Sequence, residues 1–353
     1  MKVAITADVH LTTRKENPER FHALIQILRD AKNKGISHLI IAGDLFDASR
    51  QNYNEFEAIC QRVKDSGMQF TIIPGNHDPA INNQTIVGDN VNIISTPTLQ
   101  EIEGRTFLFI PYRHKGTMGD VLAEFADKLP PDKWILVGHG DWSDSWRMPN
   151  PTEPGVYIPL TRRDISAYRP ARVFLGHIHR FLDQPPVHYV GSPCGLDITE
   201  TGRRRYLIYE TESNLVVSQT IDTEVIYFNE QFVILPGQDE LAYLEQQITS
   251  KIQAWYLNPS EQERARIRIR VQGYSTNRKA IKNLLDEAFQ GFRFYKDEEP
   301  DISEVSSVTD PERDYLAQAV LAKLETLSWP FGKDEPGQDK VVLAALHLLY
   351  GGA

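Results

Sequence analysis

Five short apolar runs, each followed closely by Asp, Asn or His, constrain the fold of this chain most. The runs are rich in Val, Ile, Leu and aromatic residues and cover residues 2–6, 38–42, 70–73, 134–137 and 172–175. Runs of this length and composition predict strands buried in a sheet. A glycine and then a polar residue follow most of them. Because open α/β sheets form their sites where loops leave the carboxyl ends of strands, we expect these polar residues to cluster.

Helical patterns lie between the runs. The clearest covers residues 21–28, where apolar residues recur at helical spacing. Asn17 is the expected N-cap, Pro18 stands in the first turn and Gly35 lies past the end, so the start and stop signals agree with the period. A second helix is expected over residues 54–64. The alternation of strand and helix predicts an α/β fold.

The polar segments after the runs supply residue types suited to binding two metal ions. Two divalent cations about 4 Å apart can hold a phosphate between them, lower the pKa of a water and stabilise the attacking and leaving oxygens. A lone His-x-His is more often structural, because many histidines simply satisfy a backbone partner. Five of the ten histidines fall in these segments, however, and clustered His and Asp point to a metal or catalytic site. The candidate residues are Asp8, His10, Asp44, Asn76, His77, His139, His177 and His179.

Seven of the eight divide into a bridging carboxylate and two sets of terminal ligands. Asp44 is the best candidate for the bridge, because it follows a strand and a glycine that lets the backbone come close. The expected sets are Asp8, His10 and His179 for one metal, and Asn76, His139 and His177 for the other. Imidazole and carboxylate together suit Mn, Fe or Zn better than Mg or Ca, and we expect two divalent ions, with Mn as the first choice.

These motifs, in this order, resemble those of the calcineurin-like metallophosphoesterase superfamily, over residues 1 to about 210. The resemblance implies a two-sheet β-sandwich flanked by helices, in an αββα arrangement. It also implies that His77 is the catalytic residue that protonates the leaving oxygen. Asp47 resembles the carboxylate that orients this histidine, although some relatives carry a histidine at its position. An N-cap or turn aspartate is the alternative for Asp47.

Within the superfamily, the chain is most similar to the SbcD-type nucleases. Residues 189–193, then 199–200 and 205–209, resemble the segment that closes their phosphoesterase domain; an ordinary turn between two strands is the alternative. The similarity implies a manganese-dependent DNA exonuclease and endonuclease subunit for DNA repair and recombination, which hydrolyses phosphodiester bonds with two metals. It further implies a homodimer and an SbcC-type, SMC-like ATPase partner.

The predicted organisation has three parts. Residues 1–236 form the metallophosphoesterase domain. Residues 237–298 form a small α/β cap for DNA recognition, with helices at 239–256 and 277–289 and strands at 264–271 and 292–296. Residues 299–353 form the third part, where the acidic stretch 297–304 is expected to lead, as a solvated linker, into helices at 310–327 and 340–350. These helices dock on the ATPase in SbcD relatives; packing on their own domain is the alternative.

Charge limits how this chain can bind DNA. The net charge of −10 and the pI near 5.5 argue against broad adhesion to phosphates, which needs surplus Lys and Arg. Any DNA contact must be local, and alternation with apolar residues predicts one strand face that carries Arg264, Arg266, Arg268 and Arg270. A solvated outer face explains the same alternation.

Two other functions are compatible with the motifs. A free-standing phosphodiesterase or phosphatase that acts on nucleotides or phosphoproteins would suit the acidic surface. A scaffold without catalysis is disfavoured, because such proteins lose ligands or the acid and this chain keeps them. No run approaches the roughly 20 apolar residues of a membrane span, and two cysteines give no disulfide framework. We therefore expect a cytoplasmic enzyme, in a bacterium or, if phage-encoded, in its host.

Overall fold

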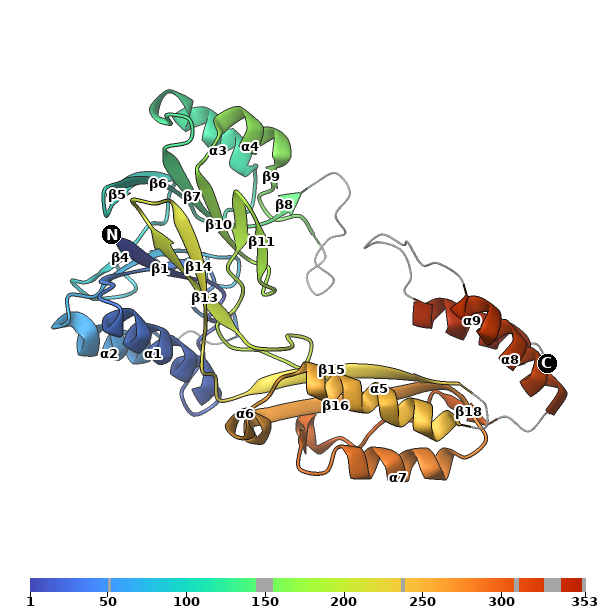
Figure 1. Cartoon of the computed structure of the whole chain (residues 1–353). Coiled ribbons are helices and arrows are strands. Elements are labelled where there is room, and N and C mark those ends of the chain that lie inside the picture. The colour runs from blue at the N-terminus through green and yellow to red at the C-terminus, as the bar shows by residue number, and fades with distance from the viewer. Residues whose placement is uncertain (50–51, 144–154, 236–238, 308–310, 327–337, 351–353) are drawn as a thin grey trace. The chain divides into compact units, whose positions relative to one another are not determined.

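The computed structural model describes residues 1–49, 52–143, 155–235, 239–307, 311–326 and 338–350 (Figure 1). The chain divides into two compact units. Unit 1 comprises Met1–Leu196 and Arg203–Val225, and unit 2 comprises Asp197–Gly202 and Ile226–Ala353. No helix among the described residues is long and apolar enough to span a bilayer.

Unit 1 contains two mixed six-stranded sheets and a two-stranded one. The first has the order β14-β13-β1-β2-β3-β4 and consists of β1 (Lys2–Thr6), β2 (His38–Ala42), β3 (Gln69–Ile73), β4 (Val91–Ile93), β13 (Arg205–Glu210) and β14 (Leu215–Thr220). The second has the order β11-β12-β10-β7-β6-β5 and consists of β5 (Thr98–Ile102), β6 (Arg105–Ile110), β7 (Trp134–His139), β10 (Arg172–Gly176), β11 (Leu182–Gln184) and β12 (Val187–Tyr189). The short pair is β8 (Trp142–Ser143) and β9 (Leu160–Thr161). All five predicted strands are present, and they pair in parallel within their sheets.

The two large sheets pack face to face because their central strands are apolar on both sides. In β1, Val3 and Ile5 enter the core between the sheets, whereas Ala4 faces the core under the helices. In β7, Ile135 lies between the sheets and Trp134 faces away from them. Such period-two burial on both faces is what a sheet covered on both sides requires.

Helices cover the outer face of each sheet. The first sheet is covered by α1 (Pro18–Asn33) and α2 (Tyr53–Lys64), and the second by α3 (Met118–Phe125), η1 (Ala126–Lys128) and α4 (Arg162–Tyr168). The predicted αββα sandwich is therefore confirmed. Helix α1 begins at Pro18, as predicted, but the Asn17 side chain accepts the Thr12 hydroxyl at 2.8 Å and makes no capping hydrogen bond.

Unit 2 is a small parallel sheet with helices on one face. Its strands are β15 (Ile226–Ile234), β16 (Ala265–Ser275), β17 (Arg293–Phe294) and β18 (Val305–Ser307), and its helical segments before residue 300 are α5 (Glu240–Ala254), α6 (Pro259–Arg264), α7 (Arg278–Ala288) and η2 (Tyr295–Asp297). Ile267, Ile269 and Val271 of β16 pack against α5 and α7. The sequence placed β15 in the first domain. The structure divides the chain at Val225, ahead of β15, because β15 pairs with β16 along its whole length.

The last two helices pack on each other and on the sheet of unit 2. Helices α8 (Pro311–Glu325) and α9 (Gln338–Tyr350) enclose a small core with Tyr274 of β16. The acidic stretch ahead of them is exposed at Asp297, Glu299, Asp301 and Glu304, as expected of a solvated segment, but it also contacts the sheet. Glu298 pairs with Arg268, Asp301 forms a β-bridge with Arg270, and β18 adds to the sheet. The stretch is therefore held along β16.

Candidate metal centre

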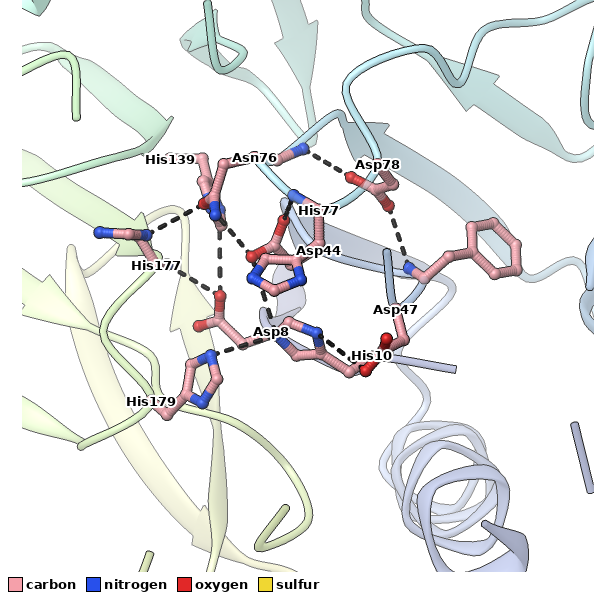
Figure 2. A network of polar contacts seen from close by, with 12 residues as sticks. Asp8, His10, Asp44, Asp47, Asn76, His77, Asp78, His139, His177 and His179 are labelled. Carbon is pink, nitrogen blue, oxygen red and sulfur yellow. Dashed lines mark hydrogen bonds and ion pairs between the residues drawn. The ribbon is translucent and has the colours of Figure 1, made fainter. Parts of the chain in front are cut away.

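The eight predicted residues come together at the carboxyl ends of five strands of unit 1 (Figure 2). The loops that follow β1 and β2 run side by side: the Asp8 amide donates to the Gly43 carbonyl, and the His10 amide donates to the Asp44 carbonyl, both at 3.0 Å. The loops after β3, β7 and β10 close the cluster from the other side. The parallel strand order thus brings together residues that lie far apart in the chain, from Asp8 to His179.

Asp8, His10 and His179 form the first group, as the sequence suggested. Their ligand atoms lie within 4.8 Å of one another, and the Nε2 atoms of the two histidines are 3.1 Å apart. Asp8 is fully buried, and its Oδ2 has no hydrogen-bond partner among the described residues. A buried carboxylate oxygen left in this way, facing two imidazoles, is what a divalent cation would satisfy.

Asn76, His139 and His177 form the second group. The Asn76 Oδ1 lies 2.8 Å from His139 Nε2 and 3.0 Å from His177 Nδ1. His139 Nδ1 lies 2.9 Å from the Ala42 carbonyl and so donates its proton there, which leaves Nε2 directed at the cluster. Asp44 Oδ2 is 3.2 Å from His139 Nε2 and 3.7 Å from His10 Nε2, so Asp44 stands between the two groups.

His77 lies at the edge of the cluster. Its backbone amide donates to Asp44 Oδ1 at 2.8 Å, and its ring meets the edge of the His10 ring at a centroid distance of 4.6 Å. The side chain is half-buried, whereas Asp8, His10, Asp44 and His139 are buried. A substrate therefore reaches His77 more easily than it reaches the deeper residues.

Asp47 contacts other residues than the resemblance implied. Its Oδ1 accepts the Ser49 amide at 2.9 Å, and its Oδ2 lies 3.3 Å from Arg20 Nη1 and 4.0 Å from His10 Nδ1. These contacts place Asp47 beside His10, whose ring separates it from His77 (Figure 2). The arrangement supports an Asp47 that acts on His10 and not one that orients His77.

Burial and charge perturb the pKa values of the cluster. Burial raises the pKa of Asp8 to about 6 and lowers the pKa of His10 to about 3. Burial alone would also lower the pKa of His139, but the Asp44 carboxylate outweighs it and raises the value to about 10. Without a cation, the site thus keeps a proton on His139 to balance its buried carboxylates. A metal ion would supply the same positive charge.

Strained backbone marks the same residues. Asp8, His10, Asp44 and His177 have φ values of 52°, 51°, 51° and 88°. This left-handed region is uncommon for residues other than glycine. Strain of this kind persists only where the surroundings over-determine it, and it concentrates at functional sites. The loops therefore keep an unfavourable backbone conformation that directs these side chains toward the cluster.

The glycines of the motifs leave room for the ligands. A Cβ on Gly43, whose φ is +92°, would lie 2.0 Å from His139 Nδ1. A Cβ on Gly75 would lie 2.0 Å from Asp44 Oδ1, and one on Gly176 would lie 2.1 Å from the Ala42 carbonyl oxygen. The close packing of neighbouring loops thus explains why a glycine comes before most of the polar residues.

Three buried residues that hold the site were not singled out from the sequence. Asp78 accepts the Gly75 amide at 2.7 Å and the Phe46 amide at 3.0 Å, which joins the two loops that carry Asn76 and Asp44. Arg20 contacts the His10 carbonyl, and Arg204 contacts the His179 carbonyl. Arg20 could have been found as a charge on the apolar face of α1. Arg204 lies in a basic run that normally indicates surface, and nothing local distinguishes it.

An aromatic edge flanks the second group. The Tyr157 ring lies 4.7 Å from the His177 ring and 5.9 Å from the Tyr112 ring, by centroids. The Tyr157 amide donates to Asp141 Oδ2 at 2.8 Å, and a Cβ on Gly140 would lie 2.5 Å from the Tyr157 carbonyl oxygen. Both tyrosines are half-buried, so flat aromatic surface borders the cluster.

The four predicted arginines of unit 2 do not share one strand face. Arg264 is the last residue of α6, and its Nε donates to the Ser260 carbonyl, because β16 begins one residue later. Arg266, Arg268 and Arg270 alternate along β16 as predicted. Arg268 forms a bidentate ion pair with Glu298, both bonds at 2.7 Å. Its charge is therefore matched within the chain.

The chain was compared with curated proteins and with solved structures. None of the curated proteins compared with the chain matches it. Among solved structures, the TT1561 protein of Thermus thermophilus is 14% identical, with a TM-score of 0.41, over 62% of this chain and 98% of that one. A structure described as a novel archaeal phosphodiesterase is 15% identical, with a TM-score of 0.35, over 63% of this chain and 100% of that one.

The family comparison is more informative, because it covers the whole candidate metal centre. Residues 1–181, just over half of the chain, match the calcineurin-like phosphoesterase family. The match spans all eight candidate residues, from Asp8 to His179. On the αββα fold, the convergent Asp and His residues and this match, the chain belongs to the calcineurin-like phosphoesterase family of metal-dependent hydrolases.

Proposed function

We propose that this protein is a manganese-dependent DNA nuclease subunit of the SbcD type, which hydrolyses phosphodiester bonds with two metal ions. The observation that carries the proposal is the convergence of two ligand groups on Asp44, with a half-buried histidine at their edge. Two divalent ions bound there would lower the pKa of an attacking water and stabilise the attacking and leaving oxygens.

Each residue has one task in this proposal. Asp8, His10 and His179 would hold one ion, Asn76, His139 and His177 would hold the other, and Asp44 lies between the two groups. His77 donates a proton to the leaving oxygen, because its ring is open to substrate while its backbone is fixed by Asp44. His139 presents its Nε2 to the cluster, because its Nδ1 lies against the Ala42 carbonyl.

Two surfaces support a nucleic acid substrate. In unit 1, Tyr157 and Tyr112 offer flat rings beside His177 on which a base can stack. In unit 2, the strand register places Tyr227, Arg266 and Arg293 side by side across β15, β16 and β17. Because Arg268 is paired with Glu298, we assign the phosphate contacts of unit 2 to Arg266 and Arg293 in preference to the other predicted arginines.

The terminal helices support a protein partner. Their inner side packs around Tyr274, but Tyr315, Leu316 and Leu348 are exposed by 80%, 50% and 83%. We propose that this outer side docks on the coiled-coil base of an SbcC-type, SMC-like ATPase, and that the nuclease acts as a homodimer. Exposed apolar residues on a helix pair are suited to a helical partner.

The test compares substrates under one set of conditions. The protein, alone and with an SbcC-type ATPase, is incubated with linear duplex DNA and with bis(p-nitrophenyl) phosphate, in Mn²⁺, Mg²⁺, Fe²⁺ or Zn²⁺. We expect nucleotide release from DNA in Mn²⁺, abolished by EDTA and lost in Asp44→Asn. Hydrolysis of small phosphoesters alone, with no nucleotide release from DNA in any metal or with the ATPase, would contradict the nuclease proposal.

A free-standing phosphodiesterase or phosphatase is the second candidate. It is favoured by the net charge of −10 and by the carboxylate that neutralises Arg268 of β16. Substituting both Arg266 and Arg293 by Gln separates the two candidates. The nuclease should bind DNA at least about tenfold more weakly after this change, since phosphate contacts dominate affinity, and should keep its activity on the small diester.

A further inference from the structure

Two buried arginines contact the backbone of the two histidines that face each other in the first group. Arg20 comes from α1, and Arg204 stands just ahead of β13. Their exposures are 9% and 8%, although arginine is almost never this buried without partners. We infer that Arg20 and Arg204 are positioning residues that hold His10 and His179 in the geometry that binds the first metal ion. The inference rests on the proposed two-metal function.

Arg20 acts on His10 from two directions. Its Nη1 donates to the His10 carbonyl at 2.6 Å and lies 3.3 Å from Asp47 Oδ2. Asp47 in turn lies 4.0 Å from Nδ1 of the same histidine. Arg20 therefore fixes the backbone of His10, which is strained at a φ of 51°, and holds the Asp47 carboxylate on the Nδ1 side of the ring.

Arg204 acts on His179 in the corresponding way. It donates to the His179 carbonyl, and it binds Ser192 through both the carbonyl, at 3.0 Å, and the hydroxyl. The Ser192 amide donates to the same His179 carbonyl at 3.1 Å. A Cβ on the preceding Gly191 would lie 2.9 Å from this carbonyl oxygen, so the segment can approach only as glycine.

The contacts of Arg20 and Arg204 matter because the two histidines that they hold must bind the same cation. His10 Nε2 and His179 Nε2 are 3.1 Å apart, within hydrogen-bonding distance of each other, and both nitrogens must turn to one cation when it binds. The arginines order the two rings before the cation binds. Arg204 uses the fork of its guanidinium, with Nε and Nη2 on separate acceptors at fixed angles, which a lysine ammonium cannot do. Arg20 contacts both of its acceptors through Nη1, at the end of a longer side chain than that of lysine.

The experiment measures Mn²⁺ binding, in the full chain, by calorimetry. We expect two sites in the wild type and, in Arg20→Lys and Arg204→Lys, one site weakened about tenfold to hundredfold while the other is unchanged. At saturating Mn²⁺, kcat on bis(p-nitrophenyl) phosphate should return to within about threefold of wild type, because the ion then orders the same ligands. Arg62→Lys, an exposed arginine on α2, is the matched control and should change neither quantity.

Two results would overturn the inference. One is unchanged Mn²⁺ affinity in both lysine variants. The other is an equal weakening of both sites, which would indicate general destabilisation. If the lysine variants do not fold, Ser192→Ala carries the test, because it removes only one acceptor of Arg204 and should still weaken one site. A wild type that binds Mn²⁺ at two sites but cleaves no phosphoester would refute the proposed function and leave this inference standing.

Discussion

At the scale of single residues, the protein separates the groups that hold charge from the group that moves a proton. Asp8, His10, Asp44 and His139 are buried, and their pKa values depend on one another through burial and charge. His77 lies at their edge and is half-buried. A buried cluster binds cations firmly, whereas a proton donor must reach the substrate.

Substitution of His77 by Asn should slow hydrolysis according to the leaving group. With an alkyl leaving group, which needs a proton, we expect kcat to fall by about 10²- to 10⁴-fold. With p-nitrophenolate, which leaves without a proton, the fall should be much smaller, and Mn²⁺ affinity should change little. Steady-state kinetics on the two diesters measure this. Equal losses on both would show that His77 does not act as the acid.

Gly43 and Gly35 form a matched pair for testing close packing. Both have positive φ, +92° and +68°, but only a Cβ on Gly43 meets His139, whereas nothing lies within 4 Å of Gly35. Gly35→Ala should therefore cost only about 1 kcal/mol of unfolding free energy, from the left-handed backbone. Gly43→Ala should cost at least about 2 kcal/mol more and weaken Mn²⁺ binding. Denaturant unfolding with EDTA and calorimetry measure the two effects; similar values for the two variants would contradict the packing argument.

At the scale of elements, each central strand serves two cores and one loop of the site. Strand β2 places Ile40 between the sheets, places Leu39 and Ile41 under the helices, and ends just before Gly43. Its first residue, His38, lies at the opposite end from the metal centre. The strand can therefore be probed there without a change at the site.

His38 should make stability depend on pH. Burial lowers its pKa from 6.5 to about 4, and its Nε2 lies 2.9 Å from Thr71 Oγ1 of β3. Between pH 6.5 and 4, the unfolded chain binds a proton that the folded chain does not, so stability is lost as the pH falls through this range. Because His38 is only partly buried, we expect it to account for about 1–3 kcal/mol of that loss.

The measurement compares wild type and His38→Gln, both in EDTA, by denaturant unfolding at about pH 7.5 and about pH 5, on either side of the ordinary histidine pKa. Glutamine keeps a hydrogen-bonding side chain but does not titrate. The variant should lose less stability than wild type between the two pH values. If both lose the same amount, His38 is not the group responsible.

At the scale of the whole molecule, the chain has separate cores with separate tasks. All the residues of the candidate metal centre belong to unit 1, whereas β15, β16 and the last two helices belong to unit 2. Heating in calorimetry should accordingly show two transitions. Mn²⁺ at about 100 times its dissociation constant should stabilise unit 1 by about 2.7 kcal/mol and leave the transition of unit 2 in place. A single transition that shifts as one would show that the units unfold together.

Removal of residues 308–353 tests the same separation through function. Because the described residues of α8 and α9 contact unit 2 around Tyr274 and all eight candidate metal-centre residues belong to unit 1, kcat/KM on bis(p-nitrophenyl) phosphate should stay within about twofold of wild type. Co-purification with the proposed ATPase should be lost. A large fall in small-diester hydrolysis would contradict the independence of the site.

Much of the site could be predicted from sequence, because strand–glycine–ligand motifs are local. The runs before Asp8, Asp44, Asn76, His139 and His177 are strands as predicted, and parallel pairing brings their ends together. Helices α5, α7, α8 and α9 of unit 2 lie within two residues of the predicted bounds, whereas the short α6 was not predicted. The predictions that failed concerned contacts between residues that lie far apart in the chain.

By itself, the sequence determined the fold class, the residue types of the metal centre and their order along the chain, since each follows from short-range pattern. Only the tertiary structure decided which groups contact which. In the tertiary structure, Asp47 lies beside Arg20 and His10, and Arg268 pairs with Glu298. Strand β15 belongs to unit 2, and Arg204 is buried against His179. The physical reason is the same in each case: the partner of a charge, or of a strand edge, lies far along the chain, and no local pattern encodes it.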